Sequence, residues 1–343
     1  MKYLILLVLF STVCLQQVQA KVWRINNTPG VAADFINCTD AMNAAGVLNG
    51  DTLHIEGSAI TYSGFTLSKR LIIIGTGYFL SGANSNSGLQ ANPNTANFNG
   101  GAILFDSTSS GSVLMGLDNF FLGVGPNLGS ATDNITVTRC NVSTLGQYYG
   151  YTAGTTMAGW KVNKCYILNS MDLSGQAVQN WEVTNNIFQG SINLGNSGNL
   201  NNLVRNNVFR ASITLFSAYF TNNIITGTTF TTTNVTVKNN LSTGTNLPAG
   251  NGNLNNQSDA ALFQGLTGNS TDGQWRLNAG SNAIGAGETI SGITPDCGAF
   301  GTADPYRLSG IPAIPTIYLL TVPASVPSNA SNMSITISTK SNN

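Results

Sequence analysis

The sequence predicts an all-β parallel solenoid, in which similar coils of short strands and tight turns stack on one another. Six segments share one column pattern: an apolar residue, a two-residue turn and an apolar pair. The apolar column is spaced by 25, 21, 21, 16 and 17 residues and consists of Val137, Val162, Val183, Val204, Phe220 and Val237. A strand-rich repeat near 20 residues indicates a solenoid. Only 8% of the residues are charged and Gly numbers 38, which favours short strands over long helices.

The first 20 residues are expected to be a secretory signal peptide. Lys2 supplies a positive charge, and residues 4–13 form an apolar run that is too short to span a bilayer. Small residues at 18–20 are typical of a cleavage site. A lipoprotein signal at Cys14 is an alternative, but the residue directly before Cys14 is Val rather than a small one. No later run of 18 apolar residues occurs, so we expect no transmembrane segment.

Each repeat is predicted to contain strands on two sides of its turn. Residues 181–183 alternate between inward and outward positions, as strand residues do. The Asn-Asn pair that follows is a compact turn, because Asn tolerates the left-handed backbone conformation. A further strand set lies upstream, at residues 171–173, 192–194 and 213–215. The link from this set to the apolar column shortens from ten residues to five, which explains the shorter late repeats.

The second turn residue should form a ladder of side chains inside the stack. In the last four repeats this residue is Asn186, Asn207, Asn223 or Asn240. Equivalent residues on neighbouring strands lie about 4.8 Å apart, so their amides can bond to one another. Cys140 and Cys165 occupy the same column in the two preceding repeats. We expect both to be free buried thiols, because their Cβ separation exceeds that of a typical disulfide.

These features resemble the right-handed parallel β-helix of the pectate lyase and pectin lyase-like superfamily, which has three strands per coil and an Asn turn. Residues 38–45, 50–57 and 61–77 are similar to its helical cap and first coils. Residues 281–287 and 296–301 resemble the last coils of secreted β-helix proteins from Bacteroidetes-type bacteria. The resemblance covers roughly residues 22–310 and implies the fold, not an activity.

The expected organisation is a signal peptide at 1–20, a parallel β-helix domain at 21–305 and a C-terminal segment at 306–343. The last segment contains Pro312, Pro315, Pro323 and Pro327 around two alternating apolar runs. This pattern predicts a Pro-rich connector and a short hairpin. The segment is expected to cover the last coil, since an open stack needs its end blocked. The alternative is an attachment segment.

Enzymes of the superfamily that this sequence resembles need clustered carboxylates on the face of one strand set. The outward column here contains one acid and consists of Asp172, Asn193, Thr214 and Thr231. Glu182 lies on another strand set, where Lys161 on the neighbouring coil is its expected ion-pair partner. We therefore assign no catalytic residue. The alternative is a polysaccharide lyase or glycoside hydrolase with a site in the irregular region 82–133, which contains Asp106, Asp118 and Asp133.

The chain is therefore expected to be a secreted or cell-surface, non-catalytic protein that contacts polysaccharide or cell-surface glycan, or has an adhesive or structural role. Rows of Asn, Thr and Ser on its outer strands would present amides and hydroxyls. Net charge is zero without a basic stripe, so no nucleic-acid partner is expected. No cofactor or metal site is expected, since His54 is the only His and no Cys-x-x-Cys occurs.

Overall fold

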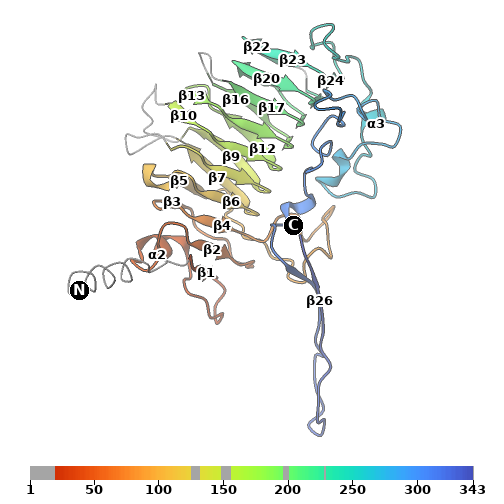
Figure 1. Ribbon diagram of the computed structural model, residues 1–343. Coiled ribbons are helices and arrows are strands. Elements are labelled where there is room, and N and C mark those ends of the chain that lie inside the picture. Colours follow the sequence, from red (N-terminus) through yellow and green to blue (C-terminus); the bar gives the residue numbers. More distant parts are fainter. Residues whose placement is uncertain (1–19, 125–131, 148–155, 196–200, 228, 343) are drawn as a thin grey trace, which may run out of the picture.

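The structure is a computed structural model that describes residues 20–124, 132–147, 156–195, 201–227 and 229–342. Its strands pair in parallel from one coil to the next and form a solenoid (Figure 1), which confirms the predicted all-β class. The expected signal peptide lies outside the described residues except for Ala20. No helix in the described part of the chain is long and apolar enough to cross a membrane.

The first sheet of the stack follows the predicted apolar column and contains ten strands. In stack order they are β1 (Val22–Ile25), β2 (Thr52–Ile55), β4 (Ile72–Ile74), β6 (Val113–Met115), β8 (Thr136–Thr138), β11 (Lys161–Asn163), β14 (Glu182–Thr184), β17 (Asn202–Arg205), β20 (Ala218–Thr221) and β23 (Thr236–Lys238). The six residues of the apolar column pair directly with one another, from Val137 to Val237, so the predicted register is confirmed.

The second sheet contains twelve strands and faces the first across the core. Nine of them form one path: β3 (Phe65–Leu67), β5 (Ala102–Phe105), β7 (Asp118–Val124), β9 (Asn141–Gln147), β12 (Tyr166–Asp172), β15 (Ile187–Phe188), β18 (Val208–Phe209), β21 (Ile224–Ile225) and β24 (Leu241–Ser242). The others extend from β12 and are β16 (Ser191–Leu194), β19 (Ile213–Phe216) and β22 (Phe230–Thr233). The upstream strand set of the sequence prediction is therefore real.

The remaining elements are short. A separate parallel pair joins β10 (Thr156–Ala158) to β13 (Ala177–Gln179), and an antiparallel pair joins β25 (Thr316–Thr321) to β26 (Thr336–Lys340). The helical elements are α2 (Cys38–Asn43), α3 (Asp259–Leu262) and the 3-10 turns η1 (Ser107–Ser109), η2 (Gly273–Trp275) and η3 (Leu308–Gly310). Helix α2 lies at the first coils, where the sequence predicted a helical cap (Figure 1).

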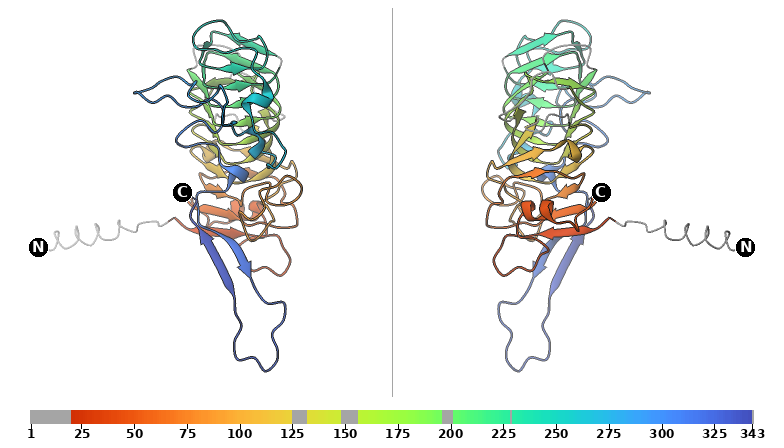
Figure 2. Two further views of the ribbon diagram at one scale, coloured as in Figure 1. Left: turned by 90° about the vertical axis from the view of Figure 1, so that its right-hand side faces the viewer. Right: turned by 90° about the vertical axis from the view of Figure 1, so that its left-hand side faces the viewer.

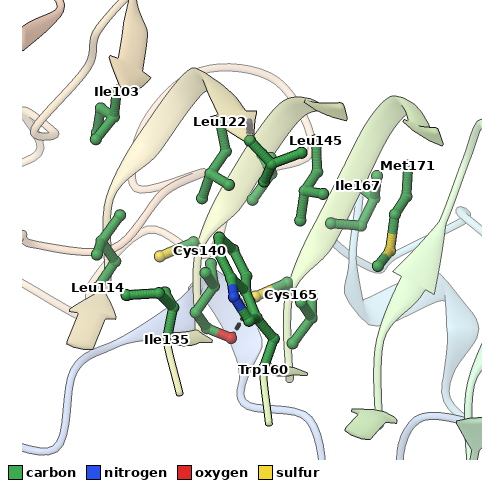
Figure 3. Packing of buried hydrophobic residues seen from close by; sticks show 14 of the residues in the cluster. Ile103, Leu114, Leu122, Ile135, Cys140, Leu145, Trp160, Cys165, Ile167 and Met171 are labelled. Atoms are coloured by element: carbon green, nitrogen blue, oxygen red, sulfur yellow. Dashed lines mark hydrogen bonds between the residues drawn. The ribbon is translucent and has the colours of Figure 1, made fainter. Parts of the chain in front are cut away.

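Stacked side chains fill the interior of the solenoid. Trp160 and Trp181 are fully buried, and their rings stack in parallel with centroids 4.9 Å apart. Phe188 and Phe209 stack in the same way at 4.8 Å. Figure 3 shows the neighbouring core, in which Cys140 and Cys165 lie among aliphatic side chains. Both thiols are free, as predicted, and so are the other two cysteines that the structure describes.

The two residues of each turn point in opposite directions. The second residue points inward, and Asn186, Asn207, Asn223 and Asn240 are fully buried as the predicted ladder requires. The Nδ2 group of each donates to the Oδ1 atom of the next, at 3.0 Å within the ladder. The first residue adopts the left-handed conformation, with φ between 53° and 58° at Arg139, Lys164, Asn185, Asn206, Asn222 and Asn239.

Residues 243–315, here called the return segment, first add one more Asn to the ladder, since Asn253 Oδ1 accepts from Asn240 Nδ2 at 3.2 Å, and then leave the stack. We expected residues 281–287 and 296–301 to form the last coils, but in the structure the chain turns back and descends along one side of the stack (Figure 1). The left-handed turn residues bind the return segment in reverse order, so that the last turn contacts its earlier part and the preceding turns contact its later part. Asn239 donates to Ala286 O at 3.1 Å, Asn206 to Asp296 O at 2.9 Å and Asn185 to Ala299 O at 3.0 Å.

An outward apolar row beneath the return segment explains this course. The row follows the turns, and its members Tyr166, Ile187, Val208, Ile224 and Leu241 pack against residues of the return segment that include Leu262, Phe263, Trp275, Cys297 and Tyr306. Gly298 comes so close that a Cβ atom there would lie 2.8 Å from Ile224 Cδ1, and its φ is 87°. Burial of this second cluster therefore covers the turn side of the solenoid.

The C-terminal hairpin also departs from expectation. It lies beside the first coils, at the opposite end of the stack from the last coil that it was expected to cover (Figure 1). Ala91 N donates to Ile317 O at 2.8 Å, and Arg139 Nη1 donates to Ile311 O at 2.9 Å. The return segment carries the chain back along the stack, so the hairpin emerges near the N-terminal coils.

Candidate functional site

The outward column of the sequence prediction exists on the second sheet. Asp172 pairs with Asn193, Asn193 with Thr214, and Thr214 with Thr231, on strands β12, β16, β19 and β22. Asp172 and Thr231 are exposed, whereas Asn193 and Thr214 are half-buried. Alternation along each strand places the intervening apolar residues in the core. The column is thus a polar strip on an otherwise regular sheet face.

The strip carries hydrogen-bonding groups but no pair of catalytic carboxylates. Asp172 accepts a hydrogen bond from the backbone N–H of Ser174 at 3.0 Å. The Oδ1 atom of Asn193 is buried and has no hydrogen-bond partner among the described residues. One carboxylate beside an amide and two hydroxyls can accept and donate hydrogen bonds, but it supplies no second group for acid–base chemistry.

The three acids of the region 82–133 serve separate local structures. Asp106 caps η1 by accepting from Thr108 N at 3.2 Å, and Asp133 accepts from Ala158 N at 2.7 Å. Residues 125–131 lie outside the described residues. Within the described part of the chain, no group of three or more His, Cys, Asp or Glu could hold a metal ion.

Asp118 is the most buried of these acids, and its carboxylate is fully occupied. It accepts from Thr95 Oγ1 at 2.6 Å, from Asn141 Nδ2 at 2.7 Å and from Asn97 Nδ2 at 3.2 Å. Burial raises the pKa of Asp118 above its ordinary value, although these three hydrogen bonds act in the opposite direction. Every donor belongs to an adjacent loop or strand, so the arrangement joins neighbouring coils rather than opening to a substrate.

A hollow of about 520 Å³ lies on the outer face of the first sheet, near the last coils. Sequence reasoning did not identify it. Tyr219 on β20 lies between Leu203 on β17 and Thr236 on β23, because the three are direct neighbours in the sheet register. The other lining residues are Asn201, Asn202, Ser217, Ala218 and Asn234. Asn202 is buried and bonds within the stack, so the hollow combines one aromatic ring with the exposed side chains of Asn201, Asn234 and Thr236.

Glu288 of the return segment fixes the hydroxyl end of Tyr219. The Tyr219 hydroxyl lies 2.9 Å from Oε1 and 2.8 Å from Oε2 of Glu288, to which it donates. Lys238 Nζ also donates to Oε1 at 2.7 Å, and the Glu288 N–H donates to Asn222 Oδ1. Contacts from two strands and one turn thus hold the carboxylate that orients the phenol.

The same contacts set the ionisation of this group of side chains. Burial alone would raise the pKa of Glu288, but hydrogen bonds from Lys238 and Tyr219 outweigh it and lower that pKa below the ordinary value. The pKa of Tyr219 is raised, first by burial and then by the neighbouring carboxylate. At neutral pH Glu288 is therefore an anion and Tyr219 a neutral donor, and the phenol is kept in one orientation.

A second hollow, of about 500 Å³, lies between the first coils and the base of the hairpin. It brings His54 and Glu56 near Ile314 and Ile317. Burial lowers the pKa of His54 and outweighs the neighbouring Glu56 carboxylate, which acts in the opposite direction. Glu56 forms an ion pair with Arg24. Glu56 is thus already engaged, and the histidine is neutral at pH 7.

Glu182 makes the predicted ion pair with Lys161, at 3.3 Å between two exposed side chains.

In comparisons of this chain with protein-family models, with curated proteins and with solved structures, no match was found.

Proposed function

We propose that this protein is a secreted or cell-surface, non-catalytic β-solenoid of the pectin lyase-like type that binds neutral glycan on the outer face of its first sheet. The hollow at Tyr219 carries this proposal. An aromatic ring has an apolar face and, in Tyr, a polar tip. A sugar ring likewise has an apolar C–H face and hydroxyl edges, so it can stack on Tyr219 while its hydroxyls bond to the surrounding amides.

The fixed orientation of the ring supports binding. Tyr219 is held by Glu288, which Lys238 holds in turn, so little side-chain freedom is lost when a ligand stacks on it. The Glu288 charge is already balanced by Lys238. The whole chain has zero net charge. A neutral glycan fits these surroundings better than a polyanion does, because the chain has no excess of basic residues that would attract a polyanion.

The test is a glycan array probed with the purified chain, followed by titration of the best ligand. Tyr219→Ala should weaken binding at least tenfold, and Tyr219→Phe should weaken it less, because the ring remains but loses the hydrogen bond by which Glu288 orients it. Thr214→Ala, on the outer face of the second sheet, is the matched control and should bind as the parent does. Equal binding by Tyr219→Ala, or loss of binding in Thr214→Ala, would overturn the assignment to this hollow.

The competing function is a polysaccharide lyase or glycoside hydrolase with its site in the region 82–133. We expect no turnover on polygalacturonate, alginate or chondroitin, with or without Ca²⁺, because each described acid there is engaged in its own structural contacts. Turnover that Asp172→Ala abolishes would place catalysis on the second sheet. Turnover that survives this change but not Asp118→Ala or Asp133→Ala would establish the loop site instead.

The proposed localisation rests on residues 1–20. Expression in a bacterium with a secretion pathway should yield a mature chain that begins at Lys21, which N-terminal sequencing can determine. A retained N-terminus would argue against secretion. Fatty acid attached to Cys14 would show a lipoprotein.

A further inference from the structure

The hairpin at residues 316–340, here called the arm, projects away from the solenoid (Figure 2). It consists of β25, β26 and the connecting loop, and its two strands pair with each other alone among the described strands. Its base is fastened, since Asn342 Nδ2 donates to Ile314 O at 2.9 Å and Ala91 N donates to Ile317 O at 2.8 Å. Beyond this base the arm extends past the first coils without a neighbour that would cover it.

The arm is apolar and exposed, and Lys340 at the end of β26 is its one charged residue. Nine of its large apolar side chains are between 40% and 57% exposed: Ile317, Tyr318, Leu319, Leu320, Val322, Val326, Met333, Ile335 and Ile337. No charged residue occurs between Arg307 and Lys340. A two-stranded hairpin is marginally stable at best in water, whereas three or more strands can be stable. A concentrated apolar patch of this kind marks an interaction surface.

The outer edge of β26 indicates which partner fits. The inner edge of β26 pairs with β25, and no other described strand pairs with the outer edge. The segment 334–338 reads Ser-Ile-Thr-Ile-Ser and is a palindrome. If two copies pair antiparallel about Thr336, every residue meets its own kind: Thr336 meets Thr336, and each Ile335 meets an Ile337. This is the self-complementarity that a two-fold interface needs.

We propose that two copies of this chain associate through their arms, with their 334–338 segments joined antiparallel about Thr336, the residue at which β26 begins, so that each hairpin extends the sheet of the other. The pairing satisfies the free backbone groups of both edges. It also brings Ile335 and Ile337 of the two copies together on one face, as cross-strand pairs. No charge is buried, because the arm has none in this part. A membrane is the less suitable partner, since Lys340 at the end of β26 is the one basic residue of the arm.

Cysteine cross-linking tests the register directly. In Thr336→Cys the two introduced thiols face each other across the two-fold axis, within the Cα separation that a disulfide allows. The native cysteines that the structure describes are buried and do not compete. Oxidation should therefore give a covalent dimer. Ser334→Cys is the matched control. Each Ser334 lies opposite Ser338 of the other chain, four residues away from the Ser334 of that chain, so the two introduced thiols cannot meet and should remain uncross-linked.

Light scattering on the purified chain tests the association itself. We expect a dimer at micromolar concentrations that becomes a monomer in Ile335→Lys/Ile337→Lys, because like charges then face each other across the edge. Val326→Lys removes an exposed apolar side chain outside the palindrome and should leave the dimer intact. A monomeric parent chain, equal cross-linking of Ser334→Cys and Thr336→Cys, or a monomer that co-sediments with phospholipid vesicles would overturn the proposal.

Discussion

Replacement of Asn207 by Ala tests the internal ladder at its centre. The Asn207 side chain is fully buried and makes five hydrogen bonds. Its Oδ1 accepts from the N–H and the Nδ2 of Asn186, at 2.9 and 3.0 Å. Its Nδ2 donates to Val183 O, Arg205 O and Asn223 Oδ1, at 2.9 to 3.1 Å. The substitution therefore affects three successive coils at once.

The expected cost follows from the groups left behind. The Asn186 N–H loses its acceptor in a site without solvent, and an unpaired buried polar group costs about 1–3 kcal/mol. The carbonyls of Val183 and Arg205 each lose a donor, and a small cavity replaces the amide. We therefore expect the free energy of unfolding to fall by about 3 kcal/mol, the upper end of the range for one such group.

Urea denaturation, followed by far-UV circular dichroism, measures this change. Asn193→Ala is the matched control, since its Oδ1 has no partner, and it should change stability by no more than about 0.5 kcal/mol. In a double-mutant cycle, Asn186→Ala and Asn207→Ala should be non-additive by more than about 0.5 kcal/mol. If Asn207→Ala costs no more than Asn193→Ala, the ladder contributes nothing specific and the reasoning fails.

Three further predictions concern other buried groups. Cys140 and Cys165 should resist iodoacetamide until urea unfolds the chain, because both are buried and burial raises the pKa of the Cys140 thiol. A linked Cys140–Cys165 peptide in mass spectra would contradict this prediction. The lowered pKa of Glu288 means that its contribution to stability is complete above the unfolded pKa of about 4.3 and is lost as pH falls through the folded value. Glu288→Gln should therefore differ from the parent in urea midpoint at pH 7, and the difference should shrink as the pH is lowered below the unfolded pKa. Trp181→Ala should cost about 3–5 kcal/mol in calorimetry and remove the near-UV signal of its stack on Trp160.

The solenoid was predictable because its interior is repetitive. Each coil must place an apolar residue over the one before it, so the column from Val137 to Val237 leaves a periodic signal in the sequence. The second residue of each turn faces the same interior, which is why Asn186 and Asn207 repeat. Cys140 and Cys165 occupy the same inward turn position as buried thiols, so their place in the column could also be predicted from the sequence.

The return segment was not predictable in the same way. It is held through backbone carbonyls, such as those of Ala286, Asp296 and Ala299, which any residue can supply. Only the outward residues carried a signal. Ile187 and Val208 follow the turns in the sequence as apolar residues, and their burial outside the coil requires a cover that the periodic pattern does not identify. Small, glycine-rich motifs near the end therefore resembled further coils.

The candidate site was missed because its parts come from distant segments. Tyr219 and Glu288 meet only after the return segment has folded back on the stack. One signal was present: Leu203 and Tyr219 are neighbours in an outward column, between Glu182 on one side and Thr236 on the other. Apolar residues at outward positions of adjacent strands indicate either a covered surface or a contact surface.

The turns connect these two halves of the molecule. In the last four turns the inward Asn stabilises the stack, while the outward left-handed residue binds the return segment. At Asn222 the outward side chain accepts from the Glu288 N–H and so positions the carboxylate that orients Tyr219. The geometry of the hollow therefore depends on a turn residue that contacts no ligand. A loss of glycan binding in Asn222→Gly without a loss of the ladder would separate these two roles, because Gly keeps the left-handed backbone and removes only the outward amide.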